Sequence, residues 1–232
     1  MRRALRIAGT LLILAGALTL VWTLLVWQWQ DPFTGLYTKW KQHQLASQYQ
    51  KRVEAFSAPI ATTSLADERR SIAREAKRYR ASSTRGEAIG RIRIPRMGVN
   101  LVLVNGTDHD TLKKGPGRDG RTFMPGENRL IYIAGHRTTY GAPFSHIDRL
   151  KSGDRVTIEV PYGTFIYAVT RHRIVKATDL SVLRSPKHEV VELQACHPRF
   201  FASHRYIAYA SLLRVEPRGA KPYELEAQAS GK

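Results

Sequence analysis

Two hydrophobic patterns divide the chain. Residues 7–27 form one continuous apolar run without a charged residue. From residue 88 onward, short runs of apolar residues alternate with polar ones, which is the period of a half-buried β-strand. We therefore expect four parts: an N-terminal anchor segment (1–30), a stalk or linker (31–87), a folded β domain (88–215) and a polar C-terminal tail (216–232).

The N-terminal run is long enough to cross a bilayer, because twenty-one helical residues at about 1.5 Å each span roughly the hydrocarbon core. Three arginines precede it and three tryptophans gather toward its far end: Arg2, Arg3, Arg6, Trp22, Trp27 and Trp29. Positive-inside bias and an aromatic interface belt both predict a cytosolic N-terminus. A cleaved signal peptide is the alternative, although its apolar region is usually only about 7–15 residues. We predict an uncleaved single-pass anchor in the cell membrane and an extracytoplasmic domain, which disfavours nucleic acid as a partner.

The segment after the anchor is basic and partly helical. Its first part, residues 31–58, shows only a weak helical pattern, which Ala58-Pro59 interrupts. Ser64 and Asp67 then resemble a capping box in front of a run of strong helix formers. Between residues 36 and 85, eleven Lys and Arg stand against four Asp and Glu. We interpret this as a stalk near the membrane that binds anionic lipid or wall polymer, or simply as a solvated helix.

The β domain contains many short strand-like runs separated by turn residues such as Gly115-Pro116-Gly117 and Ser152-Gly153-Asp154. The predicted strands cover residues 89–95, 99–104, 129–134, 155–160, 164–175, 190–195 and 205–215. Only short helical pieces fit between them, such as residues 143–150. This spacing favours an all-β barrel or sandwich. The tail after Glu216 is polar, and we expect it to be loose.

Composition narrows the possible chemistry. The chain of 26.3 kDa suits one domain with appendages. Its formal charge of +18, with a pI near 10.4, indicates either anionic partners or simply a solvated basic surface. Cys196 is the single cysteine, which excludes an internal disulfide and a cysteine-rich zinc site. A lone thiol at the end of a strand is either core filler or a nucleophile at the rim of a sheet.

A cysteine nucleophile needs a base or a cation beside it. His136 directly follows the buried-looking run 131–134 and Gly135, so its imidazole should lie at a strand rim, as Cys196 does. His197 is adjacent in sequence, but neighbours on an extended chain point to opposite faces. His146 and His204 remain competitors. We expect the other histidines to lie on the stalk or the surface: His43, His109, His172 and His188.

The reaction also needs a donor for the oxyanion that forms when the thiolate attacks a carbonyl. Arg205 begins the strand that follows the Cys196 loop, and antiparallel pairing of the two strands would bring it back beside Cys196. A guanidinium offers fixed planar donors that a lysine cannot match. Arg199 is the nearest rival.

Together these motifs resemble the sortases, the membrane-anchored cysteine transpeptidases of Gram-positive cell surfaces. Three motifs support the resemblance, and they occur in the same order as in the family. They are Ala134-Gly135-His136-Arg137, the L-x-x-C of Leu193 to Cys196 and the R-x-I of Arg205 to Ile207. The flanking Gly115-Pro116-Gly117 and Tyr140-Gly141-Ala142-Pro143-Phe144 are similar to the class E branch. The resemblance covers residues 89–215.

The resemblance implies an eight-stranded barrel and a role for each residue. Cys196 would attack the Thr–Gly carbonyl of an LPxTG- or LAxTG-type sorting signal and form a thioacyl intermediate. His136 would act as acid and base, and Arg205 would steady the oxyanion or orient the peptide. Leu193, Ala195 and Tyr140 are expected near the substrate. The partners would be secreted proteins that bear a sorting signal, and an amine of peptidoglycan or a pilin; no metal and no cofactor are expected.

One residue departs from the family pattern: Ala195 stands where a threonine usually precedes the cysteine. A hydroxyl that could assist the oxyanion or the substrate is therefore missing. An L,D-transpeptidase is a second enzyme class to weigh, but it expects S-x-G-C, and this chain has Gln194-Ala195 before the cysteine. The alternative from another class is a catalytically silent, membrane-tethered basic module that binds anionic wall polymer, for which Ala195 is the best support.

Overall fold

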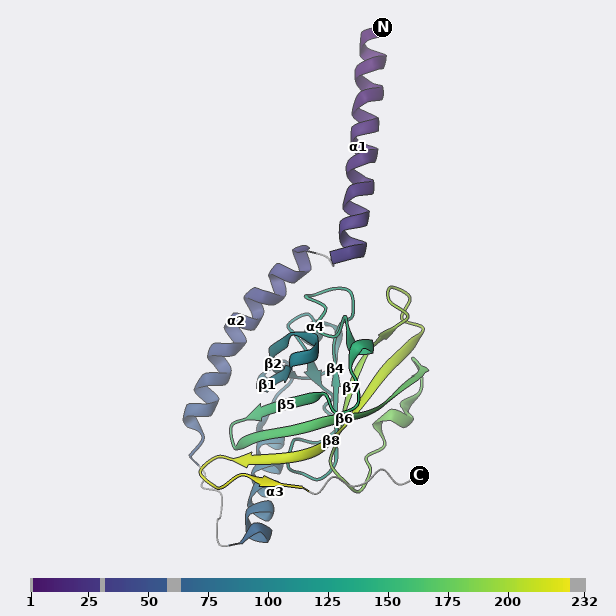
Figure 1. Ribbon diagram of the computed structural model, residues 1–232. Coiled ribbons are helices and arrows are strands. Elements are labelled where there is room, and N and C mark those ends of the chain that lie inside the picture. Colours follow the sequence, from purple (N-terminus) through teal and green to yellow (C-terminus); the bar gives the residue numbers. More distant parts are fainter. Residues whose placement is uncertain (1, 30–31, 58–63, 226–232) are drawn as a thin grey trace.

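The computed structural model describes residues 2–29, 32–57 and 64–225. The apolar run forms helix α1 (Arg2–Trp29), which extends away from the rest of the protein (Figure 1). Within it, Arg2–Leu24 is long and apolar enough to cross a membrane, and its most apolar stretch is not buried against the rest of the protein. A spanning helix would cover this apolar surface with lipid rather than with protein.

Eight strands close into a barrel. They are β1 (Ala88–Ile94), β2 (Val99–Asn105), β3 (Gly117–Arg118), β4 (Leu130–Ala134), β5 (Arg155–Val160), β6 (Gly163–Lys176), β7 (Val190–His197) and β8 (His204–Pro217). Their hydrogen-bonded order is β6-β5-β1-β2-β3-β4-β7-β8, and β8 pairs back onto β6. Closure pairs the two outer edges that an open sheet would leave free. The predicted eight-stranded barrel is therefore confirmed.

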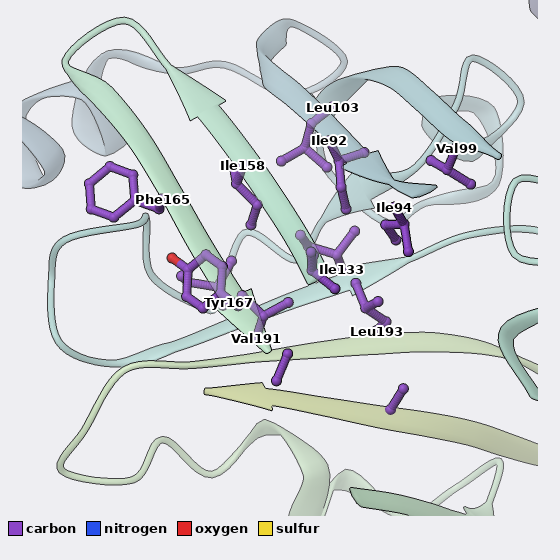
Figure 2. Close-up of a cluster of buried hydrophobic side chains, with 14 of the residues drawn as sticks. Ile92, Ile94, Val99, Leu103, Ile133, Ile158, Phe165, Tyr167, Val191 and Leu193 are labelled. Carbon is purple, nitrogen blue, oxygen red and sulfur yellow. The ribbon is translucent and has the colours of Figure 1, made fainter. Parts of the chain in front are cut away.

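The barrel interior is filled by side chains that take every second position along the strands (Figure 2). Ile92 of β1, Ile133 of β4, Phe165 of β6, and Val191 and Leu193 of β7 are all fully buried there. Burying one such side chain contributes roughly 1.5–3 kcal/mol. The alternation that predicted the strands is thus the pattern that fills the core.

Helix α2 (Pro32–Ala55) packs along the outside of the barrel. Leu45 and Tyr49 are buried in a cluster with residues of β1 and β2. Gln42 replaces a strand neighbour: its Nε2 donates to the carbonyl of Val102 at 3.0 Å, and the amide of Val102 donates to its Oε1 at 2.7 Å. The helical pattern of this segment is weak because part of its contact face is polar. The segment is not a stalk free of the barrel.

Helix α3 (Leu65–Ser82) is also part of the folded unit. The predicted cap is confirmed, because the amide of Asp67 donates to the hydroxyl of Ser64 at 3.1 Å. On the inner face of the helix, Ile72 and Ala76 join the main core cluster. The hydroxyl of Tyr79 donates to the carbonyl of Ile89 at 3.1 Å. Most of its basic side chains are exposed, whereas Arg80 forms an ion pair with the buried carboxylate of Glu127 at 2.8 Å.

The structure adds short elements that the sequence pattern did not predict: α4 (His109–Leu112), the two-residue strand β3 and the 3₁₀ turns η1 (Pro95–Met97) and η3 (Leu180–Leu183). The helical piece expected at 143–150 is reduced to the 3₁₀ turn η2 (Ile147–Arg149).

The expectation of a loose tail from residue 216 is wrong as far as Leu225. Strand β9 (Tyr223–Glu224) pairs with β8, and the amide of Leu225 donates to the carbonyl of Leu213 at 2.8 Å. These backbone bonds satisfy the edge of β8 beyond its pairing with β7. The predicted break at Ala58-Pro59 and the last seven residues, 226–232, lie outside the described residues.

Candidate active site

Strand β7 carries Cys196 at its C-terminal end. On one side β7 pairs in parallel with β4, so that Ala134 lies opposite Gln194. On the other side it pairs antiparallel with β8, so that Cys196 lies opposite Arg205. Cys196 and Arg205 therefore face each other across one ladder position, as the sequence predicted. The parallel register also brings the residues that follow β4 to the same end of the sheet.

Gly135 lets the chain turn tightly after β4. Its amide donates to the carbonyl of Gln194 at 3.0 Å, which continues the ladder by one bond. A Cβ at this position would lie 2.7 Å from the ring of Phe144, so a side chain would overlap that buried ring. The amide of Phe144 in turn donates to the carbonyl of His136 at 3.1 Å. The Gly-His pair is thus held against Phe144, which fixes the backbone from which the imidazole projects.

Cys196, His136 and Arg205 line one cavity of about 260 Å³. The remaining walls include Tyr132 of β4, Gln194 of β7 and apolar residues of η3. The structure thereby brings together the three residues that the sequence singled out. A space of this size, with a thiol, an imidazole and a guanidinium on its walls, suits a short peptide segment around a carbonyl group.

The surroundings of His136 favour the neutral form of its imidazole. Burial lowers its pKa below the ordinary value of 6.5, and the nearby His109 lowers it further by charge repulsion. The ring centroids of the two histidines are 6.5 Å apart. Nε2 of His136 is buried and has no hydrogen-bond partner in the part of the chain that the structure describes. A neutral imidazole with an unused nitrogen can accept a proton.

The thiol and the guanidinium are both partly accessible. Cys196 is a free, half-buried cysteine. Arg205 donates from Nη1 to the carbonyls of Ala202 and His204, at 2.7 and 3.0 Å. These bonds anchor one corner of the guanidinium on the loop between β7 and β8. Among the described residues, Nε and Nη2 of Arg205 make no hydrogen bond, so they remain available to a ligand in the cavity.

Arg137 supports the cysteine from behind, although it had no assigned role in the sequence motif. Its side chain is only 4% exposed, and Nη1 donates to the carbonyl of Cys196 at 3.2 Å. The same nitrogen lies 2.9 Å from Nδ1 of His197, and Nη2 lies 3.1 Å from a carboxylate oxygen of Asp148. Arg137 therefore ties the loop after β4 to the end of β7. His197 points to this side of the strand and not into the cavity, as alternation predicted.

The rival residues lie elsewhere. His146 precedes η2, and His204 pairs with Ser203 at 3.0 Å; neither lines the cavity. Arg199 lies in the β7–β8 loop beside Phe200 and does not line the cavity either.

Two of the three expected substrate contacts need correction. The side chains of Leu193 and Ala195 are fully buried in the barrel core, on the face of β7 opposite the cavity. They cannot touch a ligand there, because side chains alternate along a strand. Tyr140 does lie near the site, with its ring centroid 5.1 Å from that of His136. Its ring borders the histidine but does not line the cavity itself.

Several cavity residues were missed by sequence reasoning. Gln194 shares the outward face of β7 with Cys196, and its position two residues before the cysteine was a usable signal. Asp119 and Arg121 form an ion pair of 2.7 Å on the cavity wall. Burial alone would raise the pKa of Asp119, but hydrogen bonds from Arg121 and Thr107 outweigh it and hold the pKa below its ordinary value. No local pattern marked these residues, because they reach the site through the pairing of β3 with β4, which the sequence pattern did not predict.

Among residues 2–29, 32–57 and 64–225, no group of three or more His, Cys, Asp or Glu side chains is arranged to hold a metal ion.

Comparison with known proteins agrees with the motif order. The family model described as Sortase domain matches residues 92–213 of the 232. Sortase D of Bacillus subtilis is 36% identical over 129 residues, which cover 53% of this chain and 63% of that protein. Sortase SrtE1 of Streptomyces coelicolor is 27% identical over 158 residues, covering 61% of this chain and 45% of that protein. The chain thus spans less than two thirds of either relative.

Solved structures give the same result. A Clostridium perfringens sortase D5 transpeptidase superposes with a TM-score of 0.61 at 25% identity, covering 75% of this chain and 98% of the other. Sortase E of Streptomyces avermitilis gives a TM-score of 0.52 at 31% identity, covering 58% of this chain and 93% of the other. The similarity to class E therefore extends to class D. With its barrel topology and the family match over more than half its length, this chain belongs to the sortase family.

Proposed function

We propose that this protein is a membrane-anchored cysteine transpeptidase. It cleaves the Thr–Gly bond of an LPxTG- or LAxTG-type sorting signal and transfers the new carboxyl end to an amine of peptidoglycan or of a pilin. The observation that carries the proposal is that Cys196, His136 and Arg205 line the same cavity. Family membership and the name transpeptidase on the sortase D5 neighbour support the reaction type.

In the first half-reaction the thiol of Cys196 gives its proton to His136 and the sulfur attacks the Thr carbonyl carbon. His136 then protonates the leaving glycine nitrogen as the C–N bond breaks, which leaves a thioester on Cys196. The lowered pKa of His136 favours this role, because a neutral imidazole can take the thiol proton and its conjugate acid releases it readily.

In the second half-reaction a neutral amine attacks the thioester carbon. His136 takes the proton from the amine, and the new amide bond forms while the C–S bond breaks. The sulfur leaves as thiolate and regains its proton from His136. One peptide bond is broken and one is made, so no external energy source is required.

Arg205 is suited to stabilise the oxyanion of both tetrahedral intermediates. Its Nη1 is fixed by two backbone carbonyls, while Nε and Nη2 have no partner among the described residues. A donor that is already in place costs little reorganisation when negative charge develops. Ala195 points into the core, so its missing hydroxyl lies on the wrong face to act on the oxyanion.

The anchor part of the proposal rests on α1. Its segment Arg2–Leu24 is apolar overall and is not packed against the rest of the protein, and arginines occupy its N-terminal end. These features support a single crossing with the N-terminus in the cytosol and the barrel outside. Peripheral attachment through the basic face of α3 alone would leave this apolar helix in water.

A transfer assay tests the proposal. The full chain in detergent micelles is incubated with fluorescent LPxTG- and LAxTG-type peptides and triglycine, and the transfer product is quantified by chromatography. We expect product from the wild type and none from Cys196→Ala or His136→Ala. His188→Ala is the matched control, because His188 is exposed and does not line the cavity, and it should retain activity.

The outcome also separates the alternative function. A wild-type protein that makes no product with either peptide, yet binds anionic wall polymer, would favour the catalytically silent binding module and contradict the transpeptidase.

A further inference from the structure

Outside α1, large apolar side chains of the described residues are exposed singly at Leu65, Ile174 and Leu180, and in groups in two segments. In the first turns of α2 they are Leu36, Tyr37 and Trp40, which are 65%, 39% and 54% exposed. In the loop between β7 and β8 they are Phe200 and Phe201, which are 53% and 80% exposed. Grouped aromatic residues in water are costly and usually mark a surface that another phase or partner covers.

The exposed group on α2 is the outward face of that helix. Thr38 faces the barrel, where its hydroxyl donates to the carbonyl of Lys113 at 2.9 Å, and Leu45 is buried one to two turns later. Leu36 and Trp40 lie on the other side, because residues four apart share a helix face, and Tyr37 borders them three residues before Trp40. The barrel therefore cannot cover them without releasing the contacts of Thr38.

Both segments lie at the active-site end of the barrel. The amide of Tyr140 donates to the hydroxyl of Thr34 at 2.9 Å, which ties the start of α2 to the loop that carries His136. That loop leaves the C-terminal end of β4, and the β7–β8 loop leaves the same end of β7, because the two strands are parallel. In Figure 1 the start of α2 and the β7–β8 loop both lie toward the upper end of the barrel, which is the end nearer to α1.

Each exposed aromatic group carries a cation. Lys41 Nζ lies 4.3 Å from the ring centre of Trp40, and the guanidinium carbon of Arg199 lies 6.0 Å from that of Phe200. Aromatic rings combined with long basic side chains are typical of the interface between hydrocarbon and headgroups, where the ring is buried and the cation reaches the phosphates.

The anchor holds this surface close to a bilayer. Helix α1 ends at Trp29 and α2 begins at Pro32. Three residues span at most about 11 Å even when fully extended. The first turn of α2 therefore starts close to the end of the spanning helix. The separation is only slightly more than the thickness of one headgroup layer, which is about 5–8 Å.

We propose that Leu36, Tyr37, Trp40, Phe200 and Phe201 form a membrane-docking surface that inserts into the outer headgroup region of the bilayer crossed by α1. Lys41 and Arg199 contact the anionic phospholipid headgroups. The barrel is thereby held with the active-site cavity next to the membrane, instead of hanging from a flexible tether. This inference rests on the anchoring role of α1 in the proposed function.

Spin labelling of the full chain tests the docking. In a Cys196→Ala background, which removes the native thiol, a nitroxide is attached at Phe201→Cys or Trp40→Cys. Lys221→Cys is the control, because Lys221 is exposed in the turn after β8, at the opposite end of that strand. Leu12→Cys reports on α1 itself. The protein is reconstituted in vesicles of phosphatidylglycerol and phosphatidylcholine, and accessibility to oxygen and to a water-soluble nickel chelate is measured.

We expect the oxygen-to-nickel accessibility ratio at positions 201 and 40 to be several-fold higher than at position 221. Labels at 201 and 40 that match 221, while Leu12→Cys reports hydrocarbon, would overturn the docking surface and leave the anchor intact. An aqueous signal at Leu12→Cys would overturn the anchor and the docking surface together. The transfer assay with soluble peptide is independent of both results, so failure of the chemistry is recognised separately.

Discussion

The two faces of strand β7 contain different kinds of residue. Val191, Leu193 and Ala195 point into the barrel and are fully buried in its core. Gln194 and Cys196 point the other way and line the active-site cavity. One strand therefore contributes stability with one face and chemistry with the other, because its side chains alternate.

This difference teaches how to interpret the L-x-x-C motif. Leu193 and Cys196 occur in one short pattern, but the leucine packs the barrel and the cysteine faces the cavity. Changes on the inward face should alter the free energy of unfolding, and changes on the outward face should alter the rate. The following predictions separate the two faces, from the largest expected effect to the smallest.

The largest difference between the two faces is expected for the adjacent residues Leu193 and Gln194. Leu193→Ala should lower the free energy of unfolding by about 2–5 kcal/mol, because it removes packed methyl groups from the core. Gln194→Ala should change the free energy of unfolding by no more than about 0.5 kcal/mol, as is usual away from the core, while weakening peptide binding. Urea denaturation and steady-state kinetics of both variants provide the measurements. Equal destabilisation by the two variants would break the distinction between the faces.

The next effect concerns Arg205, which lies opposite Cys196. Arg205→Lys should lower kcat by about 10²–10³, the usual loss for one oxyanion donor, because a lysine cannot present a fixed planar fork. Arg214→Lys, on the same strand but outside the cavity, is the matched control and should leave kcat unchanged. An unaltered kcat in Arg205→Lys would remove this arginine from the reaction.

A smaller effect is expected from restoring the threonine of the family pattern. Ala195→Thr buries a hydroxyl in an apolar core and should destabilise the fold by about 1–3 kcal/mol, with little change in kcat. Ala195→Val introduces a side chain of nearly the same volume as threonine but without the hydroxyl. The difference in stability between the two variants therefore isolates the effect of the polar group. A large gain in kcat specific to threonine would show that the hydroxyl reaches the reaction, against the inward position of the residue.

The smallest effect is electrostatic. His109→Gln removes a charge that repels protonated His136, so the pKa of His136 should rise, although burial will keep it below the ordinary 6.5. Proton NMR titration of His136 in a Cys196→Ala background measures this shift. An unchanged pKa would mean that burial alone sets the protonation of the base.

The same shift has a consequence for stability. Because the pKa of His136 is lower in the folded protein than in the unfolded chain, protons bind the unfolded chain more readily. The contribution of this group to stability is therefore complete above about pH 6.5 and is lost as the pH falls below it. His109→Gln should reduce that loss, which pH-dependent urea denaturation can detect.

Much of the fold followed from sequence because the strands alternate cleanly. The barrel strands, the Ser64 cap and the meeting of Cys196 with Arg205 all rest on local patterns or on one antiparallel pairing. Helix α2 was harder to place, because the hydrogen-bonding side chain of Gln42 interrupts the apolar contact face to which Leu45 and Tyr49 belong. Strand β9 was missed because only two residues pair, which leaves no period to detect.

The site was only partly predictable for a similar reason. His136 lies two residues beyond β4 and Cys196 lies at the second-last position of β7, and these places at the rim of the sheet marked both residues in the sequence. Asp119 reaches the cavity through the pairing of β3 with β4, and the η3 residues reach it from the connection between β6 and β7. The inward direction of the Ala195 side chain also became known only from the structure of β7, because the motif alone does not distinguish inward from outward positions.

The most direct test of the account is the covalent state of Cys196 during turnover. The full chain is mixed with excess LPxTG- or LAxTG-type peptide without an amine acceptor, quenched in acid and examined by intact-mass and peptide-mapping mass spectrometry. We predict an acyl adduct, truncated after the Thr, on the tryptic peptide that contains Cys196, and its loss when triglycine is added. Peptide cleavage without any adduct on Cys196, or no adduct with either peptide on well-folded protein, would contradict a transpeptidase that works through the outward face of β7.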